Sequence, residues 1–308
     1  MMRAAGVLDP TGALGVFQRS EPRSLRSDEV LIDVRAAGVG NWDELMRQGL
    51  WPSGLTIPHA LGVEAAGVVV ATGSGVHRFG VGDAVLTHTF PFRDGGAWAE
   101  KVIAPTDQLA HKPDGISWPQ AGCLPVPGLT AWQAVHEAGP IRARQRVFVH
   151  GAGGVTGGLL VQLAVLAGAR VVATAGAESM ARVREYGAEH VVDRRSTTWQ
   201  QEVGDALSGG ADLAINAVPH AAAGALSMVD DGGRFVSIAG PVSQGERGIA
   251  VRNLVVHADG AQLTRLTGLL AAGDLRLSVT SVRPLSEAGQ ALDAVAAGHG
   301  RGATTLAP

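Results

Sequence analysis

Several residue types that carry particular kinds of chemistry are scarce in this 308-residue chain. It has one cysteine, Cys123, so no disulfide can form within the chain, and the expected compartment is the cytoplasm. No apolar run approaches the ~20 residues that a membrane-spanning helix needs, so we expect no membrane association. The formal net charge is −3 without a long run of one sign, which argues against a nucleic-acid partner.

The composition of the chain changes along its length. Up to about residue 122, short apolar runs such as residues 30–34 and 65–71 are broken by Gly and Pro, which indicates an antiparallel, barrel-like domain. From 123 to about 255, strand-like and helix-like segments alternate, as is typical of βαβ units on a parallel sheet. Residues 256–308 hold too few elements for a core of their own. We therefore expect an α/β protein in which residues 256–308 return to the domain of residues 1–122.

The boundaries of the expected elements follow from the apolar patterns. In the second region we expect strands at 147–150, 170–174, 190–193, 212–216 and 234–238, and helices at 155–166, 178–186 and 197–207. After residue 256 we expect helices at 260–272 and 286–297, and strands at 278–282 and 303–306.

A glycine-rich turn, HGAGGVTGG at residues 150–158, lies between an expected strand and an expected helix. The spacing Ala152-x-Gly154-x-x-Gly157 is similar to the dinucleotide-binding pattern G-x-G-x-x-G, with Ala in first place. Gly154 would let the backbone approach a pyrophosphate, and Gly157 would let the helix pack on the strand. A tight turn in some other α/β protein is the alternative, but the strand–turn–helix–strand context favours a cofactor site.

The end of the next expected strand bears on the choice of cofactor. Folds that prefer NAD place Asp or Glu there to bind the ribose 2′-hydroxyl. Here residues 172–176 read VATAG, and Glu178 lies beyond the strand end with Ser179 and Arg182 close by. An uncharged strand end with a nearby Arg favours the 2′-phosphate of NADP. The alternative is that Arg182 is only a solvated helix residue.

A short-chain dehydrogenase is excluded by a missing pair of residues. That class needs Tyr-x-x-x-Lys, whereas the single tyrosine, Tyr186, is followed four places later by His190. The lysines are Lys101 and Lys112, both far from Tyr186 in the sequence.

Several short motifs follow one another in a fixed order: AGVGNWD at 37–43, LGVEAAGVV at 61–69, GGAWAE at 95–100, GLTAW at 128–132 and GGRFV at 232–236. In this order they resemble the zinc-independent, quinone oxidoreductase-like family of the medium-chain dehydrogenases/reductases. The resemblance covers nearly the whole chain. It implies a GroES-like β-rich catalytic domain at 1–122 and 256–308, a Rossmann NADP-binding domain at 123–255, the cofactor in the cleft between them, and a homodimer.

The glycine turn, the strand ends and the resemblance give a set of candidate site residues. For binding of NADPH we expect Thr130, Gly153, Gly154, Val155, Thr156, Thr174, Gly176, Ser179, Arg182, Asn216 and Ala239. The resemblance places Asn41, Asp43 and Trp51 near the nicotinamide and the substrate. No catalytic acid or base stands out. Asp43 is alternatively a carboxylate at a helix N-terminus, Trp51 is alternatively a packing residue, and Cys123 is interpreted as a small core residue in an apolar setting.

Departures from the relatives decide the expected chemistry. Zinc-dependent relatives carry Gly-His-Glu where this chain has Gly62-Val63-Glu64, and a valine cannot bind a metal ion. Without zinc to stabilise an alkoxide, oxidation of a simple alcohol is difficult, whereas a quinone or an α,β-unsaturated carbonyl compound accepts hydride at an activated carbon. The sequence therefore predicts a metal-free NADPH-dependent reductase of such small electrophiles. Gly40 falls where quinone reductases usually have Asn, which leaves open an NADPH-binding protein with little or no turnover.

Overall fold

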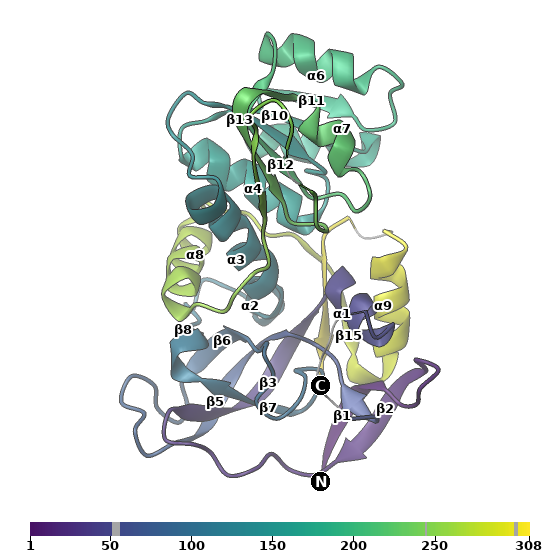
Figure 1. Ribbon diagram of the computed structural model, residues 1–308. Helices are drawn as coiled ribbons and strands as arrows, with labels where there is room; N and C mark the ends of the chain where they lie inside the picture. The colour runs from purple at the N-terminus through teal and green to yellow at the C-terminus, as the bar shows by residue number, and fades with distance from the viewer. Residues whose placement is uncertain (51–55, 244, 299–300) are drawn as a thin grey trace. The chain divides into compact units, whose positions relative to one another are not determined.

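The computed structural model describes residues 1–50, 56–243, 245–298 and 301–308, and the chain divides into two compact units (Figure 1). Unit 1 comprises Met1–Leu129 and His257–Pro308, and unit 2 comprises Thr130–Val256. The first division between the units falls inside helix α3 (Pro125–Gln133). Trp51, a candidate substrate residue, lies outside the described residues.

Unit 2 is built on a parallel sheet with the strand order β11-β10-β9-β12-β13-β14. Its strands are β9 (Arg146–His150), β10 (Arg170–Ala175), β11 (His190–Asp193), β12 (Ala211–Asn216), β13 (Val229–Ser237) and β14 (Ala250–Asn253). The order reverses between β9 and β12, and open α/β sheets bind ligands beyond the carboxyl ends of the strands at such a point. This sheet confirms the expected Rossmann-type α/β fold.

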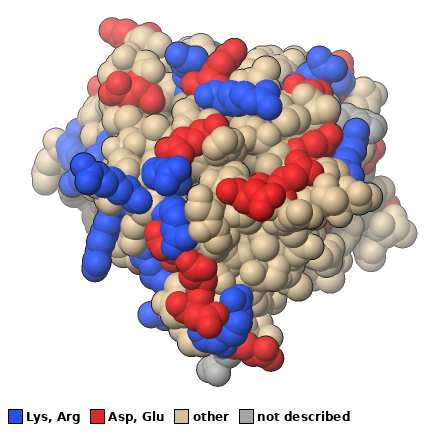
Figure 2. Space-filling view, turned by 90° about the horizontal axis from the view of Figure 1, so that it is seen from above, with Lys and Arg blue, Asp and Glu red and all other residues tan. Residues whose placement is uncertain are grey.

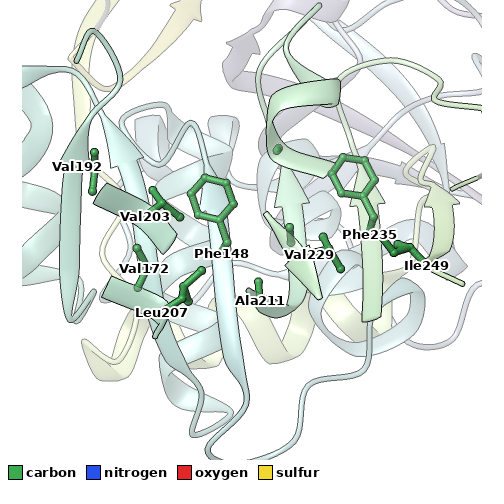
Figure 3. Packing of buried hydrophobic residues seen from close by; sticks show 11 residues of the cluster. Phe148, Val172, Val192, Val203, Leu207, Ala211, Val229, Phe235 and Ile249 are labelled. Atoms are coloured by element: carbon green, nitrogen blue, oxygen red, sulfur yellow. The ribbon is translucent and has the colours of Figure 1, made fainter. Parts of the chain in front are cut away.

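Helices connect the strands of unit 2 and bury its core. They are α4 (Val155–Leu166), α5 (Met180–Glu185), α6 (Trp199–Leu207) and α7 (Ala222–Leu226). One apolar cluster runs across the sheet from Val192 to Ile249, with the rings of Phe148 and Phe235 on β9 and β13 (Figure 3). Val203 and Leu207 pack α6 onto this cluster. Helix α4 is buried from residue 157 to 164, as its all-round apolar sequence predicts.

The differences from the sequence-based expectation in unit 2 include two short elements and one helix start. Helix α7 and strand β14 were not expected, because each is too short to show a periodic pattern. The expected helix at 178–186 begins with a separate 3-10 turn, η3 (Ala177–Ser179), before α5. That turn closes through a hydrogen bond from the Ser179 N–H to the Gly176 carbonyl at 2.8 Å.

Unit 1 contains two mainly antiparallel sheets. The larger has the order β15-β16-β3-β5-β6-β8, with β7 also paired to β3, and the smaller has the order β2-β1-β4. The strands are β1 (Met2–Val7), β2 (Leu14–Arg19), β3 (Glu29–Val39), β4 (His59–Ala60), β5 (Glu64–Thr72), β6 (Ala84–His88), β7 (Lys101–Pro105), β8 (Leu109–His111), β15 (Val279–Pro284) and β16 (Ala303–Ala307). Strand β16 pairs with β3, so the C-terminal strands extend a sheet that residues 29–111 begin.

Capping side chains set the starts of two helices in unit 1, α2 (Trp118–Cys123) and α8 (Gly260–Ala272). The unit also contains α1 (Asn41–Arg47) and α9 (Ala288–Ala296). The side chain of Asp259 accepts from the N–H of Gln262 at 2.9 Å at the start of α8, and Gly273 ends that helix with a φ of 82°. Ser117 and Gln120 cap α2 reciprocally. No helix of the described residues is long and apolar enough to cross a membrane.

Acidic and basic side chains are interspersed on the face of the molecule that Figure 2 shows. Such mixing gives no broad field of one sign on that face.

Candidate cofactor and substrate sites

The glycine turn between β9 and α4 is shaped by contacts that exclude side chains at two positions. A Cβ on Gly157 would lie 2.1 Å from the carbonyl oxygen of Gly151, so only glycine lets α4 approach the turn. Gly151 has a φ of 93°, in the left-handed region that favours glycine. Gly154, in contrast, is exposed, and a Cβ there would meet nothing closer than 3.9 Å. The turn therefore presents open backbone at the start of α4, where an anion can approach free of steric hindrance.

The N-terminus of α4 has the electrostatics of an anion site. Gly154 is its N-cap, no side chain caps the helix, and its first turn contains no acidic residue. Val155 and Thr156 occupy this first turn and are half-buried. The partial positive charge of the helix end is thus not offset by a neighbouring carboxylate in that turn.

Thr174 and His150 hold the glycine turn against β10. The Thr174 hydroxyl accepts from the Gly151 N–H at 3.1 Å and lies 2.8 Å from Nδ1 of His150. The His150 ring stacks on Trp199, with centroids 5.0 Å apart, and burial lowers the pKa of His150 to about 4. His150 is therefore neutral at pH 7. Thr174, expected to contact the cofactor, has its hydroxyl engaged in supporting the turn, and the sequence did not assign His150 to the site.

Three candidate residues meet at the end of β10. The guanidinium of Arg182 donates to the carbonyl oxygen of Gly153 at 2.8 Å and to the Ser179 hydroxyl at 3.3 Å. Arg182 thereby places a positive charge beside the glycine turn. A carboxylate oxygen of the exposed Glu178 lies 2.5 Å from where a Cβ on Gly176 would stand. The strand end, uncharged in sequence, is thus followed by a cation that contacts the glycine turn and by an anion near Gly176.

The remaining cofactor candidates lie at two other strand ends and in one helix. Asn216 ends β12, and its amide donates to the Val218 carbonyl at 3.0 Å while its oxygen accepts from the Val218 N–H at 3.2 Å. Ala239 follows β13 and is half-buried. Thr130 is half-buried in α3. Apart from Thr130, the cofactor candidates lie at or just beyond the carboxyl ends of β9, β10, β12 and β13, which are neighbours in the sheet.

In unit 1, Asp43 joins the start of α1 to the loop at residues 61–63. Its side chain is completely buried and accepts from the N–H groups of Gly40 at 2.9 Å and Gly62 at 3.1 Å. Burial raises the pKa of Asp43 to about 7, against the opposite effect of these two bonds. Asp43 is thus a helix N-terminal carboxylate that also fixes a second segment. Asn41, at the first position of α1, is exposed.

The side chains beside this loop are buried and already bonded. Val63 is 3% exposed, and Glu64 accepts from the Val126 N–H at 2.7 Å. Burial raises the pKa of Glu64 well above its usual range, and the nearby Asp43 raises it further. Cys123 is buried, which confirms it as a core residue, and this burial raises the pKa of its thiol. Within the described part of the chain, no three His, Cys, Asp or Glu side chains are grouped so that they could hold a metal ion.

Comparison with known proteins matches both parts of the chain. A family model described as the alcohol dehydrogenase GroES-like domain matches residues 26–114, and one described as zinc-binding dehydrogenase matches residues 186–304. A quinone oxidoreductase of Pseudomonas aeruginosa is 30% identical in an alignment 317 positions long, which covers 95% of this chain and 94% of that protein.

For two further relatives, the share of the other protein that this chain covers differs widely. The phthioceranic/hydroxyphthioceranic acid synthase of Mycobacterium tuberculosis is 32% identical over 299 residues, which cover 91% of this chain but 14% of that protein. The solved structure of the quinone oxidoreductase from Coxiella burnetii matches with a TM-score of 0.87 and 26% identity, covering 100% of this chain and 99% of the other. With its motifs, its two units and these relatives, the chain belongs to the quinone oxidoreductase-like family of the medium-chain dehydrogenases/reductases, which are pyridine-nucleotide-dependent oxidoreductases.

Proposed function

We propose that this chain is a zinc-independent reductase that uses NADPH to reduce a quinone or another α,β-unsaturated carbonyl compound. The observation that carries the proposal is the loop at residues 62–64. Val63 offers no metal ligand there, and the carboxyl groups of Asp43 and Glu64 are buried and accept backbone N–H groups. This donor set does not suit the activation of an alcohol by a metal ion.

The cofactor proposal rests on the glycine turn and Arg182. The exposed backbone of Gly154 at the uncapped start of α4 fits a pyrophosphate, and Arg182 beside Ser179 fits a 2′-phosphate. NADH is the second candidate, because the carboxylate of Glu178 lies over Gly176, where it could accept from a ribose 2′-hydroxyl.

The glycine turn and Arg182 would hold NADPH, which would supply a hydride to a conjugated carbon of the acceptor and be oxidised to NADP⁺, and the acceptor would take one proton from water. Asp43 and Glu64 support this reaction through the backbone that they hold in place. Because both carboxyl groups are turned to backbone N–H groups, neither is assigned as the proton donor. The polypeptide must then stabilise the negative charge that develops on the acceptor oxygen by hydrogen bonding.

The test mixes the purified protein with NADPH and a panel of acceptors that includes 1,4-benzoquinone, 1,4-naphthoquinone and 2-cyclohexen-1-one. We expect the absorbance of the reduced nicotinamide to fall with at least one acceptor, at a rate that a metal chelator leaves unchanged. Binding of NADPH in calorimetry without turnover on any acceptor would favour the other candidate function, an NADPH-binding protein. Loss of turnover on chelation would refute zinc independence.

We also propose that the protein is a cytoplasmic homodimer. Strand β14 forms the last position in the sheet order and is largely exposed, so one of its edges can pair with a second copy. Light scattering after size exclusion should then give twice the 31.5 kDa of one chain. A mass of one chain at micromolar concentration would contradict the dimer.

A further inference from the structure

His150 and Thr174 lie opposite each other at the carboxyl ends of β9 and β10, where the glycine turn begins. Nδ1 of His150 is 2.8 Å from the hydroxyl oxygen of Thr174, and this oxygen also accepts from the Gly151 N–H at 3.1 Å. The backbone carbonyl of Thr174 accepts from the Ala152 N–H at 2.8 Å. Thr174 therefore holds the first two N–H groups of the turn.

The direction of the bond between His150 and Thr174 follows from the protons that each side chain carries. Burial lowers the pKa of His150 to about 4, so at pH 7 its ring has one proton, on either Nδ1 or Nε2. Thr174 is completely buried, and among the described residues its hydroxyl is bonded to Gly151 and His150 alone. A proton on Nδ1 would leave the hydroxyl proton buried without an acceptor, which folded proteins avoid. The hydroxyl therefore donates to Nδ1, and Nε2 carries the ring proton.

Aromatic packing fixes the ring of His150 in the orientation that this bond needs. Trp199 of α6 stacks on the ring, with centroids 5.0 Å apart and an angle of 19° between the planes. The ring of Phe148, two residues earlier on β9, has its centroid 5.8 Å from that of His150. The carbonyl oxygen of His150 accepts from the Ala217 N–H at 2.9 Å, so the backbone is held as well.

The bonds to Thr174 decide which N–H groups of the turn are free to bind a ligand. Gly151 has a φ of 93°, so its N–H is held at a point where the chain adopts a left-handed conformation. The N–H of Gly153 has no acceptor in the part of the chain that the structure describes, and the first N–H groups of α4 have none within the helix. The donors beyond Ala152 are thus the ones left for a phosphate.

We propose that His150 is a positioning residue for cofactor binding, which accepts the hydroxyl proton of Thr174 at Nδ1 and so holds the glycine turn in the conformation that binds the phosphates of NADPH. This inference rests on the proposed function for the identity of the ligand. His150 is 6% exposed and acts through Thr174 and the turn, without contact with the cofactor. Hydrogen bonds in a chain polarise one another, so loss of the acceptor on His150 weakens the bond between Thr174 and Gly151.

Two substitutions separate the acceptor of His150 from its ring. His150→Asn keeps an acceptor oxygen near the position of Nδ1 but loses the stack on Trp199, whereas His150→Phe keeps a stacked ring but loses the acceptor. We expect His150→Phe to raise the Kd for NADPH about tenfold, the effect of losing one hydrogen bond, and His150→Asn to stay within about threefold of wild type. Calorimetry measures these Kd values.

A merely structural role for His150 predicts the opposite order of the two variants. His150→Asn removes more packing surface than His150→Phe, so urea unfolding should show the Asn variant to be the less stable of the two. If the Kd for NADPH follows stability, with the Asn variant weaker than the Phe variant, the inference is overturned. Equal Kd values for wild type and His150→Phe would overturn it as well.

Thr174→Val tests the other partner by removing the hydroxyl at nearly constant shape. It should raise the Kd for NADPH as His150→Phe does, and the two effects should not add in the double variant, because both remove the same bond. Thr267→Val is the matched control, since the hydroxyl of Thr267 is buried in unit 1 and donates to the Thr264 carbonyl at 3.0 Å. It should leave this Kd unchanged. Fully additive effects of the substitutions at 150 and 174 would contradict a shared bond.

A last measurement uses wild-type protein without cofactor. In a ¹H–¹⁵N spectrum of the imidazole nitrogens at pH 7, Nδ1 of His150 should have the shift of an unprotonated nitrogen and Nε2 that of a protonated one. The His150 signals are those that His150→Asn removes. A proton on Nδ1 would overturn the inference and leave the proposed function in place. Failure of the proposed function is distinguishable, because wild type would then bind no NADPH, and that result would overturn both.

Discussion

Arg182 and Glu178 bring opposite charges to one end of β10, so single substitutions can separate the two cofactors. We predict that Arg182→Ala raises the Kd for NADPH about 10- to 100-fold, the loss of one or two charge-assisted hydrogen bonds to a phosphate. The Kd for NADH, which has no 2′-phosphate, should change little. Calorimetry with each cofactor measures the ratio of the two Kd values in the wild type and in the variant.

Arg184→Ala is the matched control for this substitution, because Arg184 lies on the same helix, is exposed, and should leave both affinities unchanged. Glu178→Gln should tighten the binding of NADPH, because it removes a negative charge near the phosphate, and should weaken the binding of NADH. If Arg182→Ala leaves the NADPH affinity unchanged, the phosphate lies elsewhere and NADH becomes the better candidate.

Asp43 gives the protein a pH dependence of stability with a defined sign. Its pKa is about 7 in the fold against 3.8 for an ordinary aspartate, so the native state binds more protons than the unfolded state between these two pH values. The contribution of Asp43 to the free energy of unfolding is fully present below about pH 4. It is lost as the pH rises through about 7, and the loss is at most about 4 kcal/mol.

We predict that Asp43→Asn is less stable than wild type at pH 4, because the amide cannot accept from both Gly40 and Gly62. This deficit should shrink towards pH 8, where wild type buries a charge, and urea unfolding at both pH values measures it. Glu29→Gln is a control whose stability deficit should change with pH in the opposite direction. The partner Arg23 lowers the pKa of Glu29 to about 2, so the stability that Glu29 contributes is lost as the pH falls towards this pKa. A deficit that is constant with pH would contradict the buried, protonated Asp43.

At the scale of residues, the sequence predicted side-chain types better than side-chain partners. It suggested both a site residue and a helix-start carboxylate for Asp43, and the structure shows a helix-start carboxylate that also binds Gly62. It did not find that Thr174 binds Gly151 and His150, because these contacts depend on β10 lying beside β9. The buried indole N–H of Trp42, which has no acceptor among the described residues, could not be predicted either, since a missing partner is a property of three-dimensional packing alone.

At the scale of elements, helix α4 was predictable in full because its sequence carries both its boundaries and its environment. The glycines fix its start, and the apolar residues on all sides require burial. Strand β13 was predicted to begin at Arg234, but it begins at Val229 and runs through Gly232 and Gly233. The two glycines interrupt the apolar pattern of this strand, and the pairing of β13 with β12 tolerates them at a register shift.

Two glycines of the turn before α4 should respond differently to the same substitution. Gly157→Ala places a methyl group 2.1 Å from the Gly151 carbonyl oxygen, so we predict a loss of roughly 1–3 kcal/mol of stability, measured by urea unfolding without cofactor. Gly154→Ala meets nothing within 3.9 Å and should leave this stability nearly unchanged.

For the affinity for cofactor we expect the larger effect in Gly154→Ala, the variant whose stability should change little. Gly154→Ala puts a methyl group on the exposed backbone that faces the proposed pyrophosphate, and the Kd for NADPH should rise at least about tenfold, by roughly 1.4 kcal/mol. Gly268→Ala, at an exposed position inside α8 with no atom within 4 Å, is a control that should stabilise the protein by up to about 1 kcal/mol without changing this Kd. Unaltered NADPH binding by Gly154→Ala would remove the turn from the cofactor site.

At the scale of the whole chain, alternation of strands and helices was enough to predict a parallel sheet in unit 2. The order of the strands was not predictable in the same way, because it depends on pairings between segments as far apart as β9 and β12. That order gives the candidate residues their common location, since it makes β10, β9, β12 and β13 consecutive neighbours. The candidate residues therefore lie near one another because of the strand order, and no single motif brings them together.

This convergence predicts where ligands alter hydrogen exchange in the intact protein. NADPH at about 100 times its Kd should stabilise the protein by about 2.7 kcal/mol. Protection should appear at residues 151–156, 176–182, 216–218 and 238–240, which follow the four neighbouring strands, while β1 and β2 of unit 1 serve as the internal control. Adding 2-cyclohexen-1-one to the NADP⁺ complex should extend protection to residues 40–43 and 61–63. Protection by NADPH that begins in unit 1, or that omits the ends of β9 and β10, would show that the sheet edge is not the cofactor site.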